Sequence, residues 1–312
     1  MNEKTKDVKQ LSGILPAVVT PFDADGGFAV KPFEQLLERL YAAGVHGVYL
    51  CGSTGEGMTQ SIVQRKLVTE AAVRCSPPGK QIIVHVGAAS TADAIDLATH
   101  ASVAGAHAVS SLPPLAGNYS FTEIKTYYRM LAEASELPVL VYYFPEVAPA
   151  IKSAEHILEL CALPNVVGCK FTEYDLYTML RLKQQGATVF YGRDEMLNAG
   201  LLFGADGGIG SFYNIAPQLF IDLWYLAREK KYEAALRLQK VINELITITC
   251  RYPLFPALKT ILGWIGIDCG PCLGPRRAAL TDAEAQRLRA ELEAAGIYDL
   301  LFENHGALLR RQ

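Results

Sequence analysis

The sequence predicts an α/β protein of the (β/α)8 TIM-barrel class with a C-terminal helical extension, because strand-like and helix-like patterns alternate along most of it. Short runs rich in β-branched residues occur between residues 14 and 228, separated by segments with apolar residues at i, i+3, i+4 and i+7. Eight such units in about 215 residues fit this barrel. A doubly wound sheet is the alternative, but it normally has a phosphate-binding glycine turn after its first strand. Here Pro21-Phe22-Asp23 follows instead.

The expected strands, in chain order, are residues 14–20, 47–51, 82–86, 108–111, 139–143, 166–171, 188–191 and 208–211. One apolar helical stripe between them consists of Phe33, Leu36, Leu37 and Leu40. The helix ends carry matching signals. Thr91 and Ser153 suit N-terminal caps, and three glycines stand where helices should end, namely Gly44, Gly105 and Gly186.

Three further helices are expected after the eighth unit. One carries an apolar stripe of Leu238, Val241, Ile242 and Leu245, and the others cover residues 257–264 and 283–294. No low-complexity linker precedes them. We therefore expect a flexible N-terminal tail (1–11), a barrel (12–228) and a helical extension packed on the barrel (229–312).

The composition and charge of the chain argue against several functional classes. The net charge is only −3 and no block of basic residues occurs, which argues against nucleic acid or a membrane surface as a partner. The N-terminus is charged and lacks the apolar region of a secretory signal. The chain has seven cysteines, an odd number, and they are spread along the sequence, which is typical of reduced thiols. We expect a soluble cytoplasmic protein.

The segment Cys269-Gly270-Pro271-Cys272 has the spacing of a redox motif. Redox chemistry needs the first cysteine at a helix N-terminus, where the helix dipole lowers its pKa. Pro275 prevents a helix from continuing here. A tight turn between two C-terminal helices is therefore the favoured interpretation.

Lys170 is the most informative residue in the chain, because it ends the apolar, β-branched run of residues 166–172. On this segment alone, the strand simply ends there and the side chain turns into solvent. The alternative is a buried amine. Burial favours its neutral form, which can attack a carbonyl group and form a Schiff base.

The barrel prediction brings other residues to Lys170, because reacting groups of such barrels lie at the C-terminal ends of the strands. The turn Gly52-Ser53-Thr54-Gly55-Glu56 offers hydroxyls and backbone N–H groups that suit a carboxylate. Tyr142, on the neighbouring strand, can relay a proton, although core packing is the alternative.

Asp194 and Glu195 follow the seventh strand. Two adjacent carboxylates would repel a phosphate and suit the hydroxyls of a polyol. Alternatively, Asp194 caps the following helix and Glu195 lies in its first turn. The six histidines show no metal-ligand spacing, and the glycine-rich run 204–211 lacks dinucleotide-binding spacing. We therefore expect neither a metal nor a cofactor, and we expect the glycines to let a strand pack closely.

With these motifs in place, the chain from about residue 12 to 300 resembles the pyruvate-dependent class I aldolases, the family of N-acetylneuraminate lyase and dihydrodipicolinate synthase. The segments 168–172, 191–195 and 204–214 resemble the N-acetylneuraminate lyase branch most. The resemblance implies a barrel with a helical C-terminus, a homotetramer, and a small 2-oxo acid substrate with a pyruvate moiety. It also implies roles for individual residues. Lys170 forms the Schiff base, Tyr142 transfers protons, and Ser53 and Thr54 hold the carboxylate. The residues that would line the site for the sugar tail are Thr172, Gly192, Asp194, Glu195 and Ser211.

The expected reaction is cleavage of N-acetylneuraminate to N-acetylmannosamine and pyruvate. The rivals are a 2-keto-3-deoxy sugar acid aldolase or dehydratase, a dihydrodipicolinate synthase, and a non-enzymatic relative that only binds 2-oxo acids. The synthase branch carries an arginine where this chain has Val147, which argues against a substrate with a second carboxylate.

The chain departs from the family pattern at two loops. Ala148-Pro149 and the charge of Glu146 follow the fifth strand, where the family usually has a small residue and glycine. The first tyrosine after Pro113-Pro114 is Tyr119, later than in many members.

Overall fold

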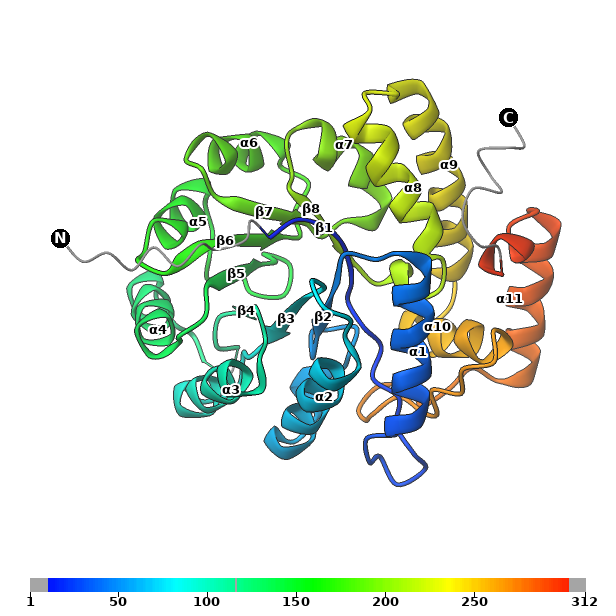
Figure 1. Ribbon diagram of the computed structural model, residues 1–312, viewed down its shortest axis with the longest axis horizontal. Coiled ribbons are helices and arrows are strands. Elements are labelled where there is room, and N and C mark those ends of the chain that lie inside the picture. Colours follow the sequence, from blue (N-terminus) through cyan, green and yellow to red (C-terminus); the bar gives the residue numbers. More distant parts are fainter. Residues whose placement is uncertain (1–10, 116, 303–312) are drawn as a thin grey trace.

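The computed structural model describes residues 11–115 and 117–302, and its centre is a barrel of eight parallel strands (Figure 1). The strands are β1 (Gly13–Pro16), β2 (Gly47–Leu50), β3 (Gln81–His85), β4 (Ala108–Ser111), β5 (Val139–Tyr143), β6 (Val166–Phe171), β7 (Thr188–Tyr191) and β8 (Gly207–Gly210). Their order is β1-β8-β7-β6-β5-β4-β3-β2. A bridge between Ala17 and Tyr49, with a 2.9 Å hydrogen bond from Val18 N to Tyr49 O, joins the two ends of the sheet. The predicted fold class is confirmed.

Eight helices alternate with the strands and surround the sheet (Figure 1). They are α1 (Val30–Ala43), α2 (Ile62–Cys75), α3 (Thr91–Ala104), α4 (Phe121–Ala134), α5 (Ala154–Cys161), α6 (Leu176–Gln184), α7 (Leu197–Leu202) and α8 (Pro217–Arg228). Short 3₁₀ turns follow three of the strands: η1 (Gly57–Thr59), η2 (Asp194–Met196) and η3 (Phe212–Asn214).

Most of the expected helix ends are confirmed. Ser153 caps α5, and Gly44 and Gly105 end α1 and α3 in the left-handed conformation. Thr91 was expected as the cap of α3, but Ser90 is the cap and its hydroxyl accepts from Asp93 N. Gly186 directly follows Gln185, the C-cap residue of α6, and has a left-handed backbone (φ 80°).

Apolar residues fill two regions, one inside the barrel and one between the strands and the helices. The inner core is made of Leu11, Leu15, Ala17, Tyr49, Ile83, Ala108, Leu140, Phe190 and Ile209. The stripe predicted for α1 is completely buried in the outer core. The glycines of β8 allow close packing, as predicted: a Cβ at Gly207 would lie 2.0 Å from Gly13 O.

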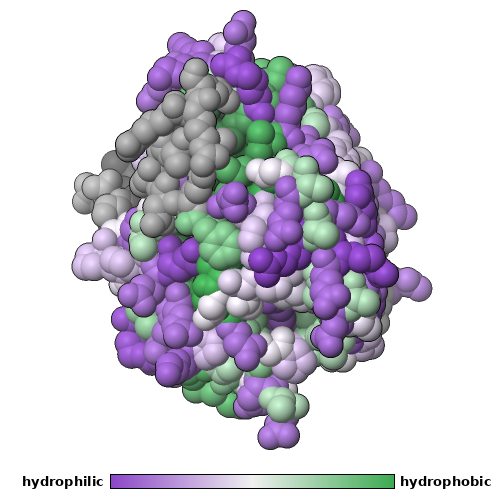
Figure 2. All heavy atoms as spheres, turned by 90° about the vertical axis from the view of Figure 1, so that its right-hand side faces the viewer, coloured by the Kyte–Doolittle hydropathy of each residue, from purple (hydrophilic) through white to green (hydrophobic). Residues whose placement is uncertain are grey.

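Up to residue 302, three α-helices follow the barrel, namely α9 (Tyr232–Thr249), α10 (Leu254–Trp264) and α11 (Asp282–Ala294), and then the 3₁₀ turn η4 (Tyr298–Leu301). Gln239 on α9 donates to Asp194 O and accepts from Asn198 N, so this helix lies against the strand-seven loop. The outward face of this region is mostly hydrophilic, with hydrophobic atoms showing between the polar side chains (Figure 2). Residues 1–10 of the predicted N-terminal tail lie outside the described residues. No described helix is both long and apolar enough to cross a membrane.

Candidate active site

Lys170 is buried inside the barrel, with only 5% of its surface exposed. It lies on β6 in register with Tyr142 on β5 and Phe190 on β7. Its Nζ lies 4.2 Å from the ring centre of Tyr142 and 4.7 Å from that of Tyr49. The interpretation in which Lys170 turns into solvent is therefore wrong. The amine is shielded from water and faced by two phenol-bearing rings.

Tyr49 is a second tyrosine of the site, and the sequence analysis missed it. Its ring stands edge-on to that of Tyr142, with 6.2 Å between the centres, and its hydroxyl donates to Ser110 Oγ over 3.2 Å. Burial raises the pKa of Tyr49 well above its usual value, so the phenol stays protonated. Its position within β2, two residues before the strand-end turn, indicates the same inward face and could have identified it.

The Ser53–Thr54 turn lies at the end of β2 and meets the end of β8. Thr54 Oγ1 and Ser211 Oγ are 2.7 Å apart, so the two predicted binding hydroxyls are brought together. Thr54 is buried and Ser53 is half-buried. Hydrogen bonds from Glu56 N to Ser53 O and from Gly57 N to Gly52 O hold the turn.

Glu56 fixes this turn to the helical extension through a buried ion pair. Its Oε1 lies 3.0 Å from Lys259 Nζ on α10, and both side chains are almost completely buried. Its Oε2 accepts from Leu273 N over 2.8 Å, and Lys259 donates to Pro271 O. Glu56 has a left-handed backbone (φ 54°). The sequence analysis assigned Glu56 no partner.

Thr172 and Gly192 are adjacent at the ends of β6 and β7. A Cβ at Gly192 would lie 2.1 Å from Thr172 Oγ1, so only glycine leaves room for this hydroxyl. Thr172 Oγ1 is buried and has no hydrogen-bond partner within the part of the chain that the structure describes. The hydrogen-bonding capacity of this hydroxyl is therefore unused among the described residues.

Asp194 does not cap its own helical turn, contrary to the alternative interpretation. Its Oδ2 accepts from Phe212 N over 2.9 Å, which ties the β7 loop to the β8 loop. Burial raises the pKa of Asp194 to about 7. A Cβ at Gly210 would lie 1.9 Å from Asp194 Oδ1, so this glycine makes room for the carboxyl group.

Glu195 lies in the same 3₁₀ turn, as expected, and is only half-buried. Its Oε1 accepts a 2.6 Å hydrogen bond from Tyr174 OH. The two adjacent carboxyl groups therefore differ: Asp194 is held inside, and Glu195 is held at the rim.

Two buried basic side chains form the wall next to Tyr49. Arg65 donates to Gly87 O over 2.8 Å and to His85 O over 2.6 Å. His85 Nε2 accepts from Leu112 N, and burial lowers the pKa of His85 well below its usual value. Within residues 11–115 and 117–302, no group of three or more His, Cys, Asp or Glu side chains has a geometry that could hold a metal ion.

The Cys269–Cys272 segment lies in the connection between α10 and α11, as expected for a turn between two helices. Burial raises the pKa of Cys269 to about 12 and that of Cys272 to about 11, so both thiols stay protonated. A protonated thiol is a poor nucleophile, which agrees with the non-redox interpretation.

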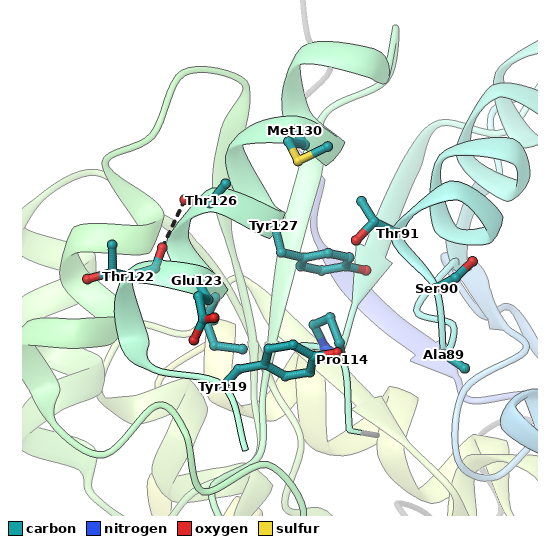
Figure 3. Close-up of a pocket in the computed structure, with 11 residues that line it drawn as sticks. Ala89, Ser90, Thr91, Pro114, Tyr119, Thr122, Glu123, Thr126, Tyr127 and Met130 are labelled. Carbon is teal, nitrogen blue, oxygen red and sulfur yellow. Dashed lines mark hydrogen bonds between the residues drawn. The ribbon is translucent and has the colours of Figure 1, made fainter. Parts of the chain in front are cut away.

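A cavity of about 490 Å³ lies beside the barrel mouth, between the start of α3 and α4 (Figure 3). Tyr119 and Tyr127 line it together with Ser90 and Thr91, and none of the predicted site residues does. Tyr127 OH and Ser111 Oγ are 2.6 Å apart, so this phenol is already bonded to β4. Tyr119, the first tyrosine of the altered fourth loop, lines this cavity and also a second one that includes Val147 and Ala148.

Comparison with known proteins places these features among aldolases. The model of the Dihydrodipicolinate synthetase family matches residues 10–295. N-acetylneuraminate lyase of Rhizobium meliloti (strain 1021) is 34% identical over 282 residues, which are 90% of this chain and 94% of the relative.

Solved structures give the same result. The structure of CdNal from Clostridium difficile in complex with mannosamine has a TM-score of 0.87 and 28% identity, covering 91% of this chain and 99% of that one. Proteus mirabilis N-acetylneuraminate lyase has a TM-score of 0.85 and 30% identity, covering 93% and 100%.

Proposed function

Because the chain belongs to the Dihydrodipicolinate synthetase family, we propose that it is a class I aldolase that cleaves a 2-oxo sugar acid to pyruvate and an aldehyde. The best substrate is N-acetylneuraminate, which would give N-acetylmannosamine. The similarity to N-acetylneuraminate lyases over nine-tenths of the chain supports this choice. The single observation that carries the chemistry is the buried amine of Lys170 between the rings of Tyr49 and Tyr142.

The reaction begins at Lys170. Its amine attacks the 2-oxo carbon, water leaves, and a Schiff base forms. The protonated imine then accepts the electron pair of the breaking carbon–carbon bond, while a base removes the proton from the hydroxyl of the departing aldehyde. Tyr142 is the group we assign to this proton transfer, because its ring lies directly at the amine.

The remaining predicted residues bind the two ends of the substrate. Ser53 and Thr54 hold the carboxylate next to the 2-oxo carbon, in a turn with backbone N–H groups and hydroxyls. We assign the substrate tail to Thr172, Gly192, Asp194, Glu195 and Ser211, of which Ser211 also lies 2.7 Å from the carboxylate-binding hydroxyl of Thr54. The free hydroxyl of Thr172 and the rim carboxylate of Glu195 suit a substrate rich in hydroxyl groups.

Two rival substrates differ from N-acetylneuraminate only in the tail. A 2-keto-3-deoxy sugar acid would use the same imine and the same hydroxyl-binding groups. The synthase reaction is less well supported, because Val147 occupies the place of the carboxylate-binding arginine and is 43% exposed. Steady-state kinetics with all three substrates tests the proposal. We expect the largest kcat/KM for N-acetylneuraminate, and a preference for aspartate semialdehyde with pyruvate would refute it.

The same proposal covers assembly, location and domain limits. From the family resemblance we propose a cytoplasmic homotetramer, with a barrel of residues 12–228 and an extension of residues 229–312. The contacts of Gln239 and Lys259 with the barrel loops support an extension that is packed on the barrel. Light scattering coupled to size-exclusion chromatography would measure the assembly.

A further inference from the structure

A row of stacked side chains leads from Lys170 to the rim of the barrel. The ring of Tyr142 lies over the amine, and the ring of Phe144 is nearly parallel to it, with 6.0 Å between the centres and 17° between the planes. The guanidinium of Arg193 lies 5.4 Å from the centre of the Phe144 ring. The rings of Tyr142 and Phe144 therefore lie between the amine and Arg193.

Side chains from two other loops hold Arg193 in this place. Its guanidinium donates to Glu146 Oε1, in the loop after β5, and lies 4.2 Å from the ring centre of Tyr174, in the loop after β6. The hydroxyl of Tyr174 in turn donates to Glu195. Four residues thus form one network, which we call the rim network: Glu146, Tyr174, Arg193 and Glu195.

The rim network has unused hydrogen-bonding capacity. Arg193 Nε is buried and has no hydrogen-bond partner among the described residues, although a guanidinium carries five N–H donors. The side chain of Arg193 is only 13% exposed, whereas that of Glu146 is 58% exposed. Arg193 is therefore a fixed donor at the rim, and Glu146 approaches it from the solvent side.

The charges of the rim network determine which kind of substrate tail can bind next to it. One guanidinium and two carboxylates leave an excess of one negative charge, and Glu146 already neutralises Arg193. A hydroxyl group can accept from Arg193 and donate to Glu195, so a neutral hydroxylated tail satisfies both. A tail carboxylate would meet a cation that is already paired and would be repelled by two carboxylates.

We propose that the Glu146–Arg193 ion pair is a specificity filter, which admits neutral hydroxylated tails and rejects tails that carry a carboxylate. The inference rests on the proposed function, since it concerns the tail of a 2-oxo acid bound at Lys170. It assigns the role to Glu146 because this carboxylate is hydrogen-bonded to the Arg193 guanidinium, the group that would otherwise bind a tail carboxylate.

The test uses the condensation of pyruvate with D-mannose and with D-mannuronate, which differ only in the carboxylate at the far end. Wild-type enzyme should prefer mannose in kcat/KM by about tenfold or more. Glu146→Gln should reduce this preference at least tenfold, mainly through a lower KM for mannuronate. The double variant Glu146→Gln/Arg193→Met should lose the improved KM for mannuronate, because it no longer has the Arg193 guanidinium that Glu146→Gln leaves unpaired.

Three results would overturn the filter: a wild-type preference for mannuronate, an unchanged preference in Glu146→Gln, or a gain that survives in the double variant. Glu155→Gln, which breaks a comparable Arg181–Glu155 pair between α5 and α6, serves as the matched control and should change neither sugar's KM. Borohydride trapping of pyruvate separates the two proposals. Absence of trapping in the wild type refutes the aldolase, whereas trapping without condensation of either sugar refutes the filter alone.

Discussion

Lys170 Nζ lies 4.2 Å from the ring centre of Tyr142, and the two residues are register partners on the adjacent parallel strands β6 and β5. Side chains of register partners in a parallel sheet point to the same face, so this pairing places both inside the barrel. The phenol and the amine are therefore brought together by the backbone and do not depend on a flexible loop.

This pairing predicts the effect of removing the phenol alone. Tyr142→Phe keeps the ring over Lys170 but loses the group that transfers the proton, so kcat should fall about 10²- to 10⁴-fold. Pyruvate should still be trapped on Lys170. Tyr143→Phe, whose ring packs against Phe171 instead, is the control and should keep nearly full activity. An unchanged kcat in Tyr142→Phe would show that Tyr142 only fills space.

The buried Glu56–Lys259 pair should stabilise both the fold and the carboxylate-binding turn. Glu56→Gln leaves Lys259 buried without a counter-charge, which typically costs about 3–5 kcal/mol of unfolding free energy. Chemical denaturation measures this loss. The KM for pyruvate in the condensation direction should rise in the same variant, because Glu56 ends the Ser53–Thr54 turn.

The double variant Glu56→Gln/Lys259→Met removes both charges and should recover much of the stability. A single variant that is as stable as the wild type would contradict a structural role for the pair. The exposed Arg181–Glu155 pair again provides the comparison, since its loss should cost well under about 1 kcal/mol.

Asp194 should make the protein less stable as the pH rises. Its carboxyl group has a pKa of about 7 in the folded protein, against an ordinary value of 3.8, so the unfolded chain ionises first. The resulting loss of unfolding free energy begins near pH 4 and grows until about pH 7. Above that pH it levels off at up to about 4 kcal/mol.

Asp194→Asn can still accept from Phe212 N and cannot ionise, so its advantage in unfolding free energy over the wild type should increase between pH 4.5 and 7.5. Denaturation curves of both proteins across this range measure the difference. Other titrating groups, including His85, cancel in the comparison. A difference that does not vary with pH would show that Asp194 is ionised throughout.

The close approach of Gly192 to Thr172 predicts a specific loss of tail binding. A methyl group at Gly192 would lie 2.1 Å from Thr172 Oγ1 and must displace it. Gly192→Ala should therefore raise the KM for the sugar acid about tenfold while pyruvate trapping persists. Gly263→Ala meets no atom within 4 Å and lies in α10, so it should be neutral or add up to about 1 kcal/mol of stability. A KM unchanged in Gly192→Ala would mean that Thr172 does not contact the tail.

Much of the fold could be predicted because its signals are local. The strands over 108–111, 139–143, 166–171 and 188–191 have the expected bounds. The first strand was expected to continue to residue 20, but β1 ends at Pro16. Its next N–H groups leave the regular ladder, since Val18 N bonds to Tyr49 O and Val19 N to the side chain of Asn214. A side-chain acceptor from a distant loop leaves no pattern in the strand itself.

Part of the site could be predicted from the rule that the reacting groups of such barrels lie at the C-terminal ends of the strands. This rule placed Lys170 beside Tyr142, because neighbouring strands of the barrel point side chains into one interior, whereas the 2.7 Å contact between Thr54 and Ser211 was not predicted. The same rule does not predict the ion-pair partner of Glu56 or the hydrogen-bond partner of Asp194. Glu56 and Lys259 are 203 positions apart, and their contact depends on how α10 packs on the barrel. The bond from Phe212 N to Asp194 likewise depends on the three-dimensional course of two loops.

The most direct test of the central claim is borohydride reduction in the presence of pyruvate, followed by peptide mass mapping. The account predicts one reduced pyruvyl adduct per chain, located on Lys170 and absent from Lys170→Met. The double variant Glu56→Gln/Lys259→Met, which removes a buried lysine outside the site together with its ion-pair partner, is the control and should still be labelled at Lys170. An adduct on any other residue, or no adduct in the folded wild-type protein, would contradict the account.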